Sequence, residues 1–255
     1  MFFALPGEYA PAGLFSGWHF LLLGVTLALV ALGLYLARHM SEGGVRRTVR
    51  VVSVLLWVLE TVKISFVLFV LDSRNPNEFL PLYYCSLVLC AGVFSSLGHG
   101  WLRRVGDCFL ATGGIVGGLA FLVFPTTSLP RYPVLHFLSM HSFLLHGLMV
   151  FVGILLLMRG VYVIAARDVW YCAGLISVMC LVAFVFNTTY KRLTGLPANL
   201  MFISEDFPGT PVTIVYQLFG RLFPVAMWLI QAFGPFYLVY FTVWMISRVK
   251  AAREK

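Results

Sequence analysis

Apolar residues recur in runs of about 20 from one end of the chain to the other. A run of this length can cross a hydrocarbon core ~30 Å thick as one α-helix. The pattern predicts seven membrane-spanning helices, at residues 17–37, 51–71, 80–97, 105–124, 134–158, 169–188 and 222–247. We therefore expect an all-α integral membrane protein in which residues 1–255 form a single multi-pass transmembrane domain.

The longest polar interruption lies between the last two predicted helices. Residues 188–211, "TTYKRLTGLPANLMFISEDFPGTP", are rich in glycine, proline and polar side chains. Loops of this length in compact proteins are usually functional or disordered. We predict that residues 189–211 fold back over the outer mouth of the bundle as a lid. The apolar residues that follow predict a short interfacial helix before Pro224.

The composition supports a membrane environment and sets the orientation. The chain is 60% hydrophobic and 11% charged, and soluble domains carry about twice that charged fraction. Its net charge of +8 comes from basic residues in short loops, an arrangement that indicates topology and not nucleic-acid binding. Twelve of these residues fall on one side of the predicted membrane and four on the other. The bias predicts an outer N-terminus, a cytoplasmic tail at 248–255 and insertion in the cell membrane.

Glycines in the fourth predicted helix indicate close helix contacts. The motif "TGGIVGG" contains two overlapping pairs spaced by four residues, Gly113/Gly117 and Gly114/Gly118. Such small-residue pairs let a neighbouring helix approach closely. We favour packing within one bundle, with homo-oligomerisation as the alternative.

The five cysteines show neither CxxC nor Cys/His metal spacing. They are odd in number and lie in or at the ends of predicted spans, so a disulfide framework and a structural zinc site are not expected. We predict no metal and no cofactor.

Ionisable groups inside hydrocarbon are costly, so each one in a predicted span is a candidate functional residue. Seven lie within or next to spans: His19, Glu60, Lys63, His136, His141, His146 and Arg221. At 1.5 Å per residue, all of them fall near the midplane or in the outer half of the bilayer. This asymmetry predicts one polar cavity that opens outward, above an inner half that is almost purely apolar.

Glu60 and Lys63 are three residues apart on one predicted helix, close enough for an ion pair. The pair is either structural or leaves Glu60 free to orient a histidine across the cavity. His136 and His146 share one face of their helix, whereas His141 points some 140° from His146. The two inner histidines are therefore expected to contact different partners. Interhelical hydrogen bonding is an alternative to catalysis for each histidine.

Cys85, in the stretch "LPLYYCSLVLC", lies at about the same predicted depth as His141. A histidine at that depth could take the thiol proton, activate the thiolate as a nucleophile and later return the proton to a leaving group. Buried cysteines also serve as small apolar packing residues. The sequence therefore leaves two readings of Cys85, a nucleophile or a packing residue.

Several motifs in order give a resemblance to a known family. "LPLYYCSL", "TGGIVGG", "FPTTSLPRYP", "HSFLLHGLMVFVG" and "NLMF" together resemble the YwaF family of multi-pass bacterial membrane proteins, over residues 80–210. YwaF-type proteins look distantly similar to an animal transmembrane acyltransferase that acts on lyso ether phospholipids and is thought to use a cysteine. The resemblance implies that Cys85 is the catalytic cysteine, that His146 and Gly147 match a family His-Gly, and that His141 matches a further histidine.

Many family members carry a histidine two positions before the cysteine, where this chain has Tyr83. A tyrosine is a poor base at neutral pH because its ordinary pKa is near 10. The base would then be His141 or His146. The predicted catalytic residues are Cys85, His146, His141 and Glu60, and the predicted substrate-binding residues are Tyr83, Tyr84, Lys63, His136, Asn199 and Arg221.

Three classes of function fit the sequence. The first is an acyltransferase or lipase that acts on membrane phospholipids, with Arg221 and Lys191 or Arg192 holding the phosphate. The second is a transporter or solute-binding protein that uses Glu60 and the intramembrane histidines. The third is a receptor or assembly factor that docks a partner on the 189–211 segment.

Overall fold

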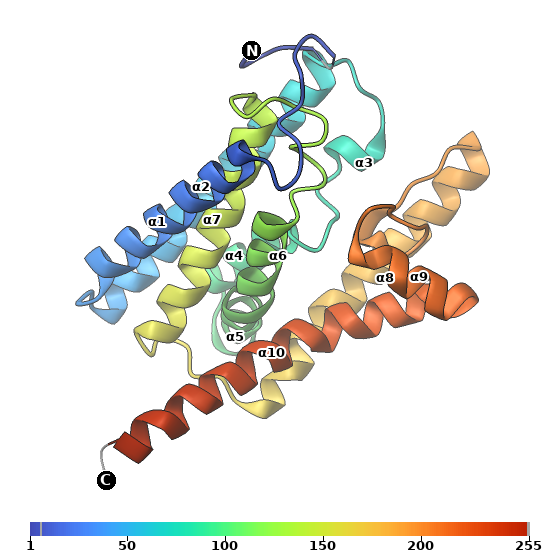
Figure 1. Cartoon of the computed structure of the whole chain (residues 1–255). Coiled ribbons are helices and arrows are strands. Elements are labelled where there is room, and N and C mark those ends of the chain that lie inside the picture. Colours follow the sequence, from blue (N-terminus) through green and yellow to red (C-terminus); the bar gives the residue numbers. More distant parts are fainter. Residues whose placement is uncertain (6, 254–255) are drawn as a thin grey trace.

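The computed structural model describes residues 1–5 and 7–253, and its regular structure there is entirely helical (Figure 1). The all-α prediction is confirmed. The elements are α1 (Gly17–Ala37), α2 (Glu42–Phe69), α3 (Pro76–Phe79), α4 (Leu87–Leu97), α5 (Gly100–Phe109), η1 (Leu110–Gly114), α6 (Ile115–Val123), α7 (Phe137–Met158), η2 (Ala166–Asp168), α8 (Val169–Thr194), η3 (Leu200–Phe202), α9 (Pro211–Phe219), η4 (Gly220–Leu222) and α10 (Phe223–Arg253).

Six helical stretches of the described chain are long and apolar enough to cross a membrane. They are Gly17–Ala37, Glu42–Phe69, Gly100–Val123, Phe137–Met158, Ala166–Thr194 and Pro211–Arg253. Their outer faces are apolar: on α1, Leu21, Val25, Leu29, Leu32 and Leu36 are all exposed. A stripe of this size would drive aggregation in water, so lipid is its natural solvent. The chain is a multi-pass membrane protein.

The third predicted span, 80–97, is only partly helical. Residues 80–86 approach in a non-helical path, and α4 contributes 11 residues, a rise of about 16 Å against a core of ~30 Å. Pro81 lacks an N–H and disfavours a helical Leu80, which is extended with φ −74° and ψ 124°. The carbonyl of Leu82 then accepts a hydrogen bond from the backbone N–H of Met201, 3.0 Å away. A proline and a hydrogen bond from a distant segment thus replace the helix predicted for residues 80–86.

The other predicted spans exist, and all but the first have shifted ends. The first has the predicted bounds, and its Ser16 cap accepts a hydrogen bond from the His19 backbone N–H at 3.2 Å. The second begins nine residues before residue 51, where the Ser41 side chain caps Glu42–Phe69. The last helix continues through the predicted tail to Arg253, and residues 254–255 of that tail lie outside the described residues.

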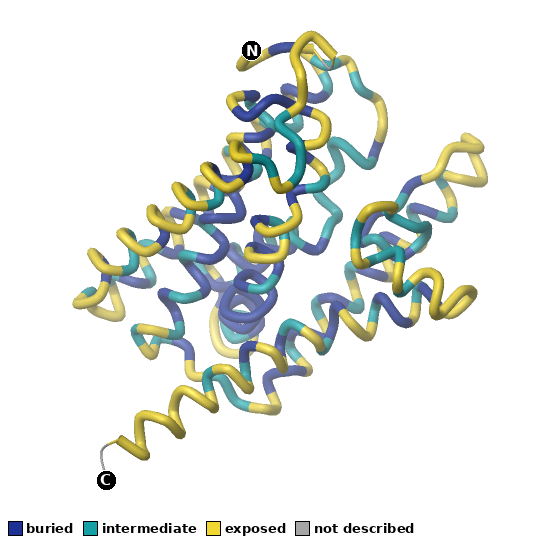
Figure 2. Tube along the Cα trace, viewed as in Figure 1, coloured by how far each residue is buried: buried dark blue, intermediate teal, exposed yellow. Residues whose placement is uncertain are grey.

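The helices form a bundle with an attached layer. Helices α1, α2 and α4–α7 make the bundle, and α8, α9 and α10 lie along one side of it (Figure 1). Burial is densest around α5, η1 and α6, whereas the outer faces of α1 and the end of α10 are exposed (Figure 2). Side chains such as Phe109, Leu110 and Met149 are almost fully buried there. The predicted span 105–124 is therefore the central element.

The two ends of the bundle also differ chemically. One end carries Arg46, Arg103, Arg104 and Arg159, and is called the arginine-rich end below; α3 and the N-terminal residues lie at the opposite end. Between them, the helix Gly100–Val123 contains a π-helical turn at Leu110–Gly114. Such π-turns often occur at functional sites.

Candidate functional site

The glycine motif places two different partners on two faces of the central helix. A Cβ at Gly113 would lie 2.6 Å from the Tyr84 hydroxyl oxygen, and one at Gly117 would lie 3.1 Å from the Tyr84 ring. On the neighbouring face, a Cβ at Gly118 would lie 2.9 Å from the carbonyl oxygen of His146. The glycines thus let α7 on one side and the Tyr84 segment on the other approach the backbone. The predicted close packing within the bundle is confirmed.

Cys85 lies beside this motif. It belongs to the non-helical residues 80–86, and a turn bond from the Val88 N–H to the Cys85 carbonyl starts α4. Its Sγ points toward the carbonyl oxygen of Gly117 at 3.9 Å, a long and weak contact for a thiol donor. The side chain is half-buried. The thiol is thus held at the surface of α6 without a strong hydrogen-bond partner.

His146 borders the next turn of the same helix. Its ring stacks on Phe121, with centroids 3.8 Å apart and planes 10° apart, and Phe121 follows Gly117 by four residues, or one helical turn. Its Nδ1 lies 2.7 Å from the Ser142 carbonyl oxygen. A carbonyl only accepts, so Nδ1 carries the hydrogen and Nε2 presents a lone pair. That Nε2 is buried and has no hydrogen-bond partner.

Several other buried polar atoms in this part of the bundle also lack partners. They are the Tyr84 hydroxyl, Ser139 Oγ and His141 Nε2. Buried polar groups are nearly always hydrogen-bonded, and exceptions concentrate where a ligand, an ion or chemistry is served. Three of the predicted site residues, Tyr84, His141 and His146, thus carry unpaired buried atoms.

Glu60 and Lys63 form the predicted ion pair, with Lys63 Nζ 2.6 Å from Glu60 Oε1. Both side chains are largely buried, and Glu60 is 4% exposed. Within the described residues, the Glu60 carboxylate accepts one hydrogen bond, from Lys63, so an orienting contact to a histidine stays a prediction. His141 packs against Phe137, whereas His146 packs against Phe121. The two histidines thus meet different neighbours.

Two predicted substrate-binding residues use their polar atoms within the protein. His136 caps α7: its Nδ1 accepts from the Leu138 N–H at 3.2 Å, so Nε2 carries the hydrogen and donates to the Ala4 carbonyl at 3.1 Å. The Asn199 side chain accepts from the backbone N–H groups of Ser204 and Glu205 at 3.0 and 3.1 Å. Both residues therefore shape the backbone, and a part in substrate binding stays a prediction.

Two further predicted substrate-binding residues, Tyr83 and Arg221, differ in their surroundings. The Tyr83 hydroxyl donates to the Asn77 carbonyl at 3.0 Å and its ring packs on Phe202. Arg221 lies in the η4 turn and is exposed. Lys191, which with Arg192 is one of the two alternatives for a second phosphate ligand, is also exposed and pairs with Glu205 at 2.7 Å. Arg221 is thus the more open of these two cations.

Part of the polar segment before α9, around residues 198–203, is packed into the protein. Leu200 and Met201 are fully buried, and Met201 adopts a left-handed backbone with φ +58°. Asn187 of α8 donates to the Leu200 carbonyl at 3.1 Å, and Gln231 of α10 donates to the Met201 carbonyl at 2.9 Å. These bonds hold the "NLMF" motif against the Cys85 segment, through the Met201–Leu82 bond described above.

The prediction of an almost purely apolar inner half is wrong. At the arginine-rich end, Asp107 is buried and accepts from Arg46 Nη1 through both carboxylate oxygens at 2.8 Å and from Ser95 Oγ at 2.6 Å. Asp107 falls inside the predicted span 105–124, so its charge was a signal that sequence analysis missed. Buried carboxylates need such partners because desolvation is costly.

A second carboxylate is buried beside it. Asp168 is fully buried and accepts from Arg104 at 2.8 and 2.7 Å and from the Tyr162 hydroxyl at 2.8 Å. Burial raises the pKa of Tyr162, so the phenol stays protonated and keeps donating at neutral pH. Cys108 and Cys172 lie against this network with sulfur atoms 3.0 Å apart. Within the described chain, no three His, Cys, Asp or Glu side chains gather as metal ligands would.

These features define a multi-pass helical membrane protein with a partly unpaired polar cluster around one glycine-rich helix. A family model matches residues 14–246. The chain therefore belongs to the TMEM164 family. Comparison with curated proteins found no match, and neither did comparison with solved structures.

Proposed function

We propose that this protein transfers acyl groups of membrane phospholipids through Cys85, with His146 as the base. The observation that carries the proposal is the unpartnered, buried Nε2 of His146. The His146 ring stacks on Phe121, which lies one helical turn along α6 from Gly117, the residue whose carbonyl the Cys85 thiol faces. A neutral imidazole whose other nitrogen is fixed by a carbonyl is suited to accept a proton. The resemblance to YwaF proteins, which implies a catalytic cysteine at this position, supports the same assignment.

The reaction would proceed in two halves. His146 Nε2 takes the Cys85 proton, and the thiolate attacks the ester carbonyl carbon; the C–S bond forms, the C–O bond breaks, and the lysolipid oxygen takes the proton from His146. In the second half, an acceptor hydroxyl gives its proton to His146 and attacks the thioester. The new C–O bond forms, the C–S bond breaks, and the thiolate regains the proton from His146. With water as acceptor, the same steps describe a lipase.

Substrate binding would use polar groups around these residues. The Tyr84 hydroxyl, which is buried without a partner, would donate to the ester carbonyl. Arg221 is the exposed cation that would pair with the phosphate. We also propose that residues 80–97 cross the membrane as a broken span and that residues 189–211 act as a lid. An outer N-terminus and insertion in the cell membrane follow from the charge bias.

The test is intact-protein mass spectrometry of full-length protein incubated with phospholipid vesicles, with lysolipid release measured in the same samples. Cys85→Ala is compared with Cys90→Ala, a control that also removes a half-buried thiol from this region. An acyl-sized adduct and lysolipid release that disappear only in Cys85→Ala would support the proposal. Turnover retained by folded Cys85→Ala would reject it.

A second candidate is solute or proton transport. It is favoured by the buried Glu60–Lys63 pair, because membrane proteins rarely bury an ion pair without using it. In proteoliposomes, flux that survives Cys85→Ala but is lost in Glu60→Gln would establish transport. Flux that is absent from the wild-type protein would exclude it under those conditions.

A further inference from the structure

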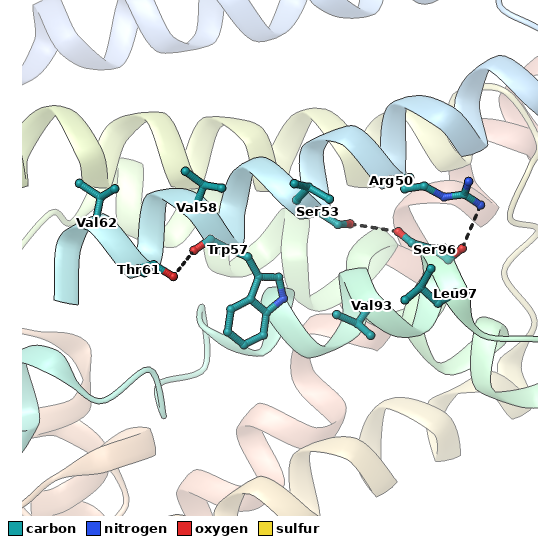
Figure 3. A pocket seen from close by; sticks show the side chains of 10 residues that line it. Arg50, Ser53, Trp57, Val58, Thr61, Val62, Val93, Ser96 and Leu97 are labelled. Carbon is teal, nitrogen blue, oxygen red and sulfur yellow. Dashed lines mark hydrogen bonds between the residues drawn. The ribbon is translucent and has the colours of Figure 1, made fainter. Parts of the chain in front are cut away.

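A groove separate from the Cys85 region runs between α2 and α4 on the outside of the bundle. It has a volume of about 380 Å³ and is lined by Arg50, Trp57, Val58 and Val62 of α2 and by Val93 and Leu97 of α4, among others (Figure 3). The two helices approach closely at Gly92, where a Cβ would lie 2.6 Å from Ser53 Oγ. Because α4 is only 11 residues long, α2 extends beyond it and one side of α2 is left uncovered.

The walls of the groove are apolar because its hydroxyl groups donate hydrogen bonds to other groups of the protein. Ser53 Oγ donates to the Val49 carbonyl at 2.7 Å, and Thr61 Oγ1 donates to the Trp57 carbonyl at 2.8 Å. Ser96 Oγ donates to Ser53 Oγ at 3.3 Å, as Figure 3 shows. What faces outward is valine, leucine and tryptophan surface, which prefers a hydrocarbon occupant.

Arg50 closes one end of the groove. It is exposed, and the one hydrogen bond that its guanidinium makes to a described residue, to the Ser96 carbonyl, is long at 3.4 Å. Its guanidinium therefore has donors free for an anion at the arginine-rich end of an apolar surface. Arginine pairs with phosphate through two parallel N–H donors, which suits a lipid phosphate better than a neutral group.

The length of the groove fits one leaflet of a bilayer. Arg50 and Val62, which line its ends along α2, are twelve residues apart, or about 18 Å of helix. Half of a ~30 Å hydrocarbon core is about 15 Å. We propose that the groove binds one acyl chain of an anionic phospholipid whose phosphate pairs with Arg50. This site is independent of the proposed acyl transfer, since it shares no residue with the Cys85 region.

Native mass spectrometry of the detergent-solubilised full-length protein tests the proposal, after titration with phosphatidylglycerol or phosphatidylcholine. We expect one retained phosphatidylglycerol per chain, with phosphatidylcholine held more weakly. Arg50→Gln should weaken phosphatidylglycerol binding about five- to tenfold, the contribution of one arginine at a lipid surface. Arg47→Gln is the matched control, because Arg47 is exposed one turn away and does not line the groove.

A second pair of variants tests the groove itself. Val58→Phe should fill it and displace both lipids, whereas Val51→Phe adds the same ring on an exposed face outside the groove and should leave binding unchanged. Equal effects of Arg50→Gln and Arg47→Gln, or lipid retention by Val58→Phe, would overturn the proposal. A dimer that Val58→Phe dissociates would overturn it too, by making the groove a contact between copies. Cys85→Ala should retain the lipid, so this test is separate from that of acyl transfer.

Discussion

Removing the Asp168 carboxylate should destabilise the protein far more than removing an exposed carboxylate. Asp168→Ala would leave three groups without their acceptor: the Arg104 guanidinium, the Tyr162 hydroxyl and the Ala165 N–H, which donates at 3.0 Å. Breaking a buried charge pair from one side typically costs 3–5 kcal/mol. The Arg104 side chain is 36% exposed, so water partly compensates it. The Tyr162 hydroxyl is buried and has no such access.

We therefore expect the lower end of that range, about 3 kcal/mol. For a chain of this size, this corresponds to a fall in melting temperature of roughly 6–12 °C. Asp168→Asn should fall between the wild type and Asp168→Ala, because it keeps one acceptor oxygen and loses the charge. Asp72→Ala is the control: its pair with Arg74 is 3.3 Å long and 84% exposed at the carboxylate, which limits its contribution to about 1 kcal/mol.

Thermal unfolding of each variant in one detergent, followed by circular dichroism, measures these differences. The double variant Asp168→Ala, Arg104→Ala adds a test of coupling, since it should lose less stability than the two single variants together. If Asp168→Ala melts within about 2 °C of Asp72→Ala, the network does not stabilise the fold as its geometry implies. Strict additivity in the double variant would equally refute a direct Arg104–Asp168 interaction.

Two further predictions concern the glycine-rich helix and its neighbours. Gly118→Ala should destabilise the protein by about 1–3 kcal/mol, because the new Cβ would lie 2.6 Å from Val150 Cγ2. Gly174→Ala is the control: its Cβ would meet nothing within 4 Å, so it should be neutral or stabilising. Equal melting temperatures of the two variants would contradict this prediction. Tyr84→Phe should leave stability unchanged because its hydroxyl has no partner, and Tyr83→Phe should cost about 1 kcal/mol by removing the bond to the Asn77 carbonyl. A loss of lipid turnover in Tyr84→Phe without a loss of stability would place that hydroxyl on the substrate.

Features set by local pattern could be predicted from the sequence. The apolar run at 17–37 predicted α1 with the bounds it has. Spacing alone predicted the Glu60–Lys63 pair and the different partners of His141 and His146. Helix periodicity fixes such relations within a single element. The glycine spacing also predicted close packing, though not that Tyr84 would occupy one of the two glycine faces.

What the sequence could not determine depends on partners that are distant along the chain. In sequence, Asp107 lies near Arg103 and Arg104, yet the fold pairs it with Arg46 and pairs Arg104 with Asp168. Residues 80–86 are not helical, and the Leu82 carbonyl among them accepts a hydrogen bond from Met201. The Nε2 of His146 has no hydrogen-bond partner because no donor or acceptor of a neighbouring described element reaches it. The sequence by itself determined the number of long apolar helices to within one and their approximate ends. Tertiary structure alone decided the pairing of buried charges and the unpaired atoms, because desolvation and hydrogen bonding depend on which elements meet.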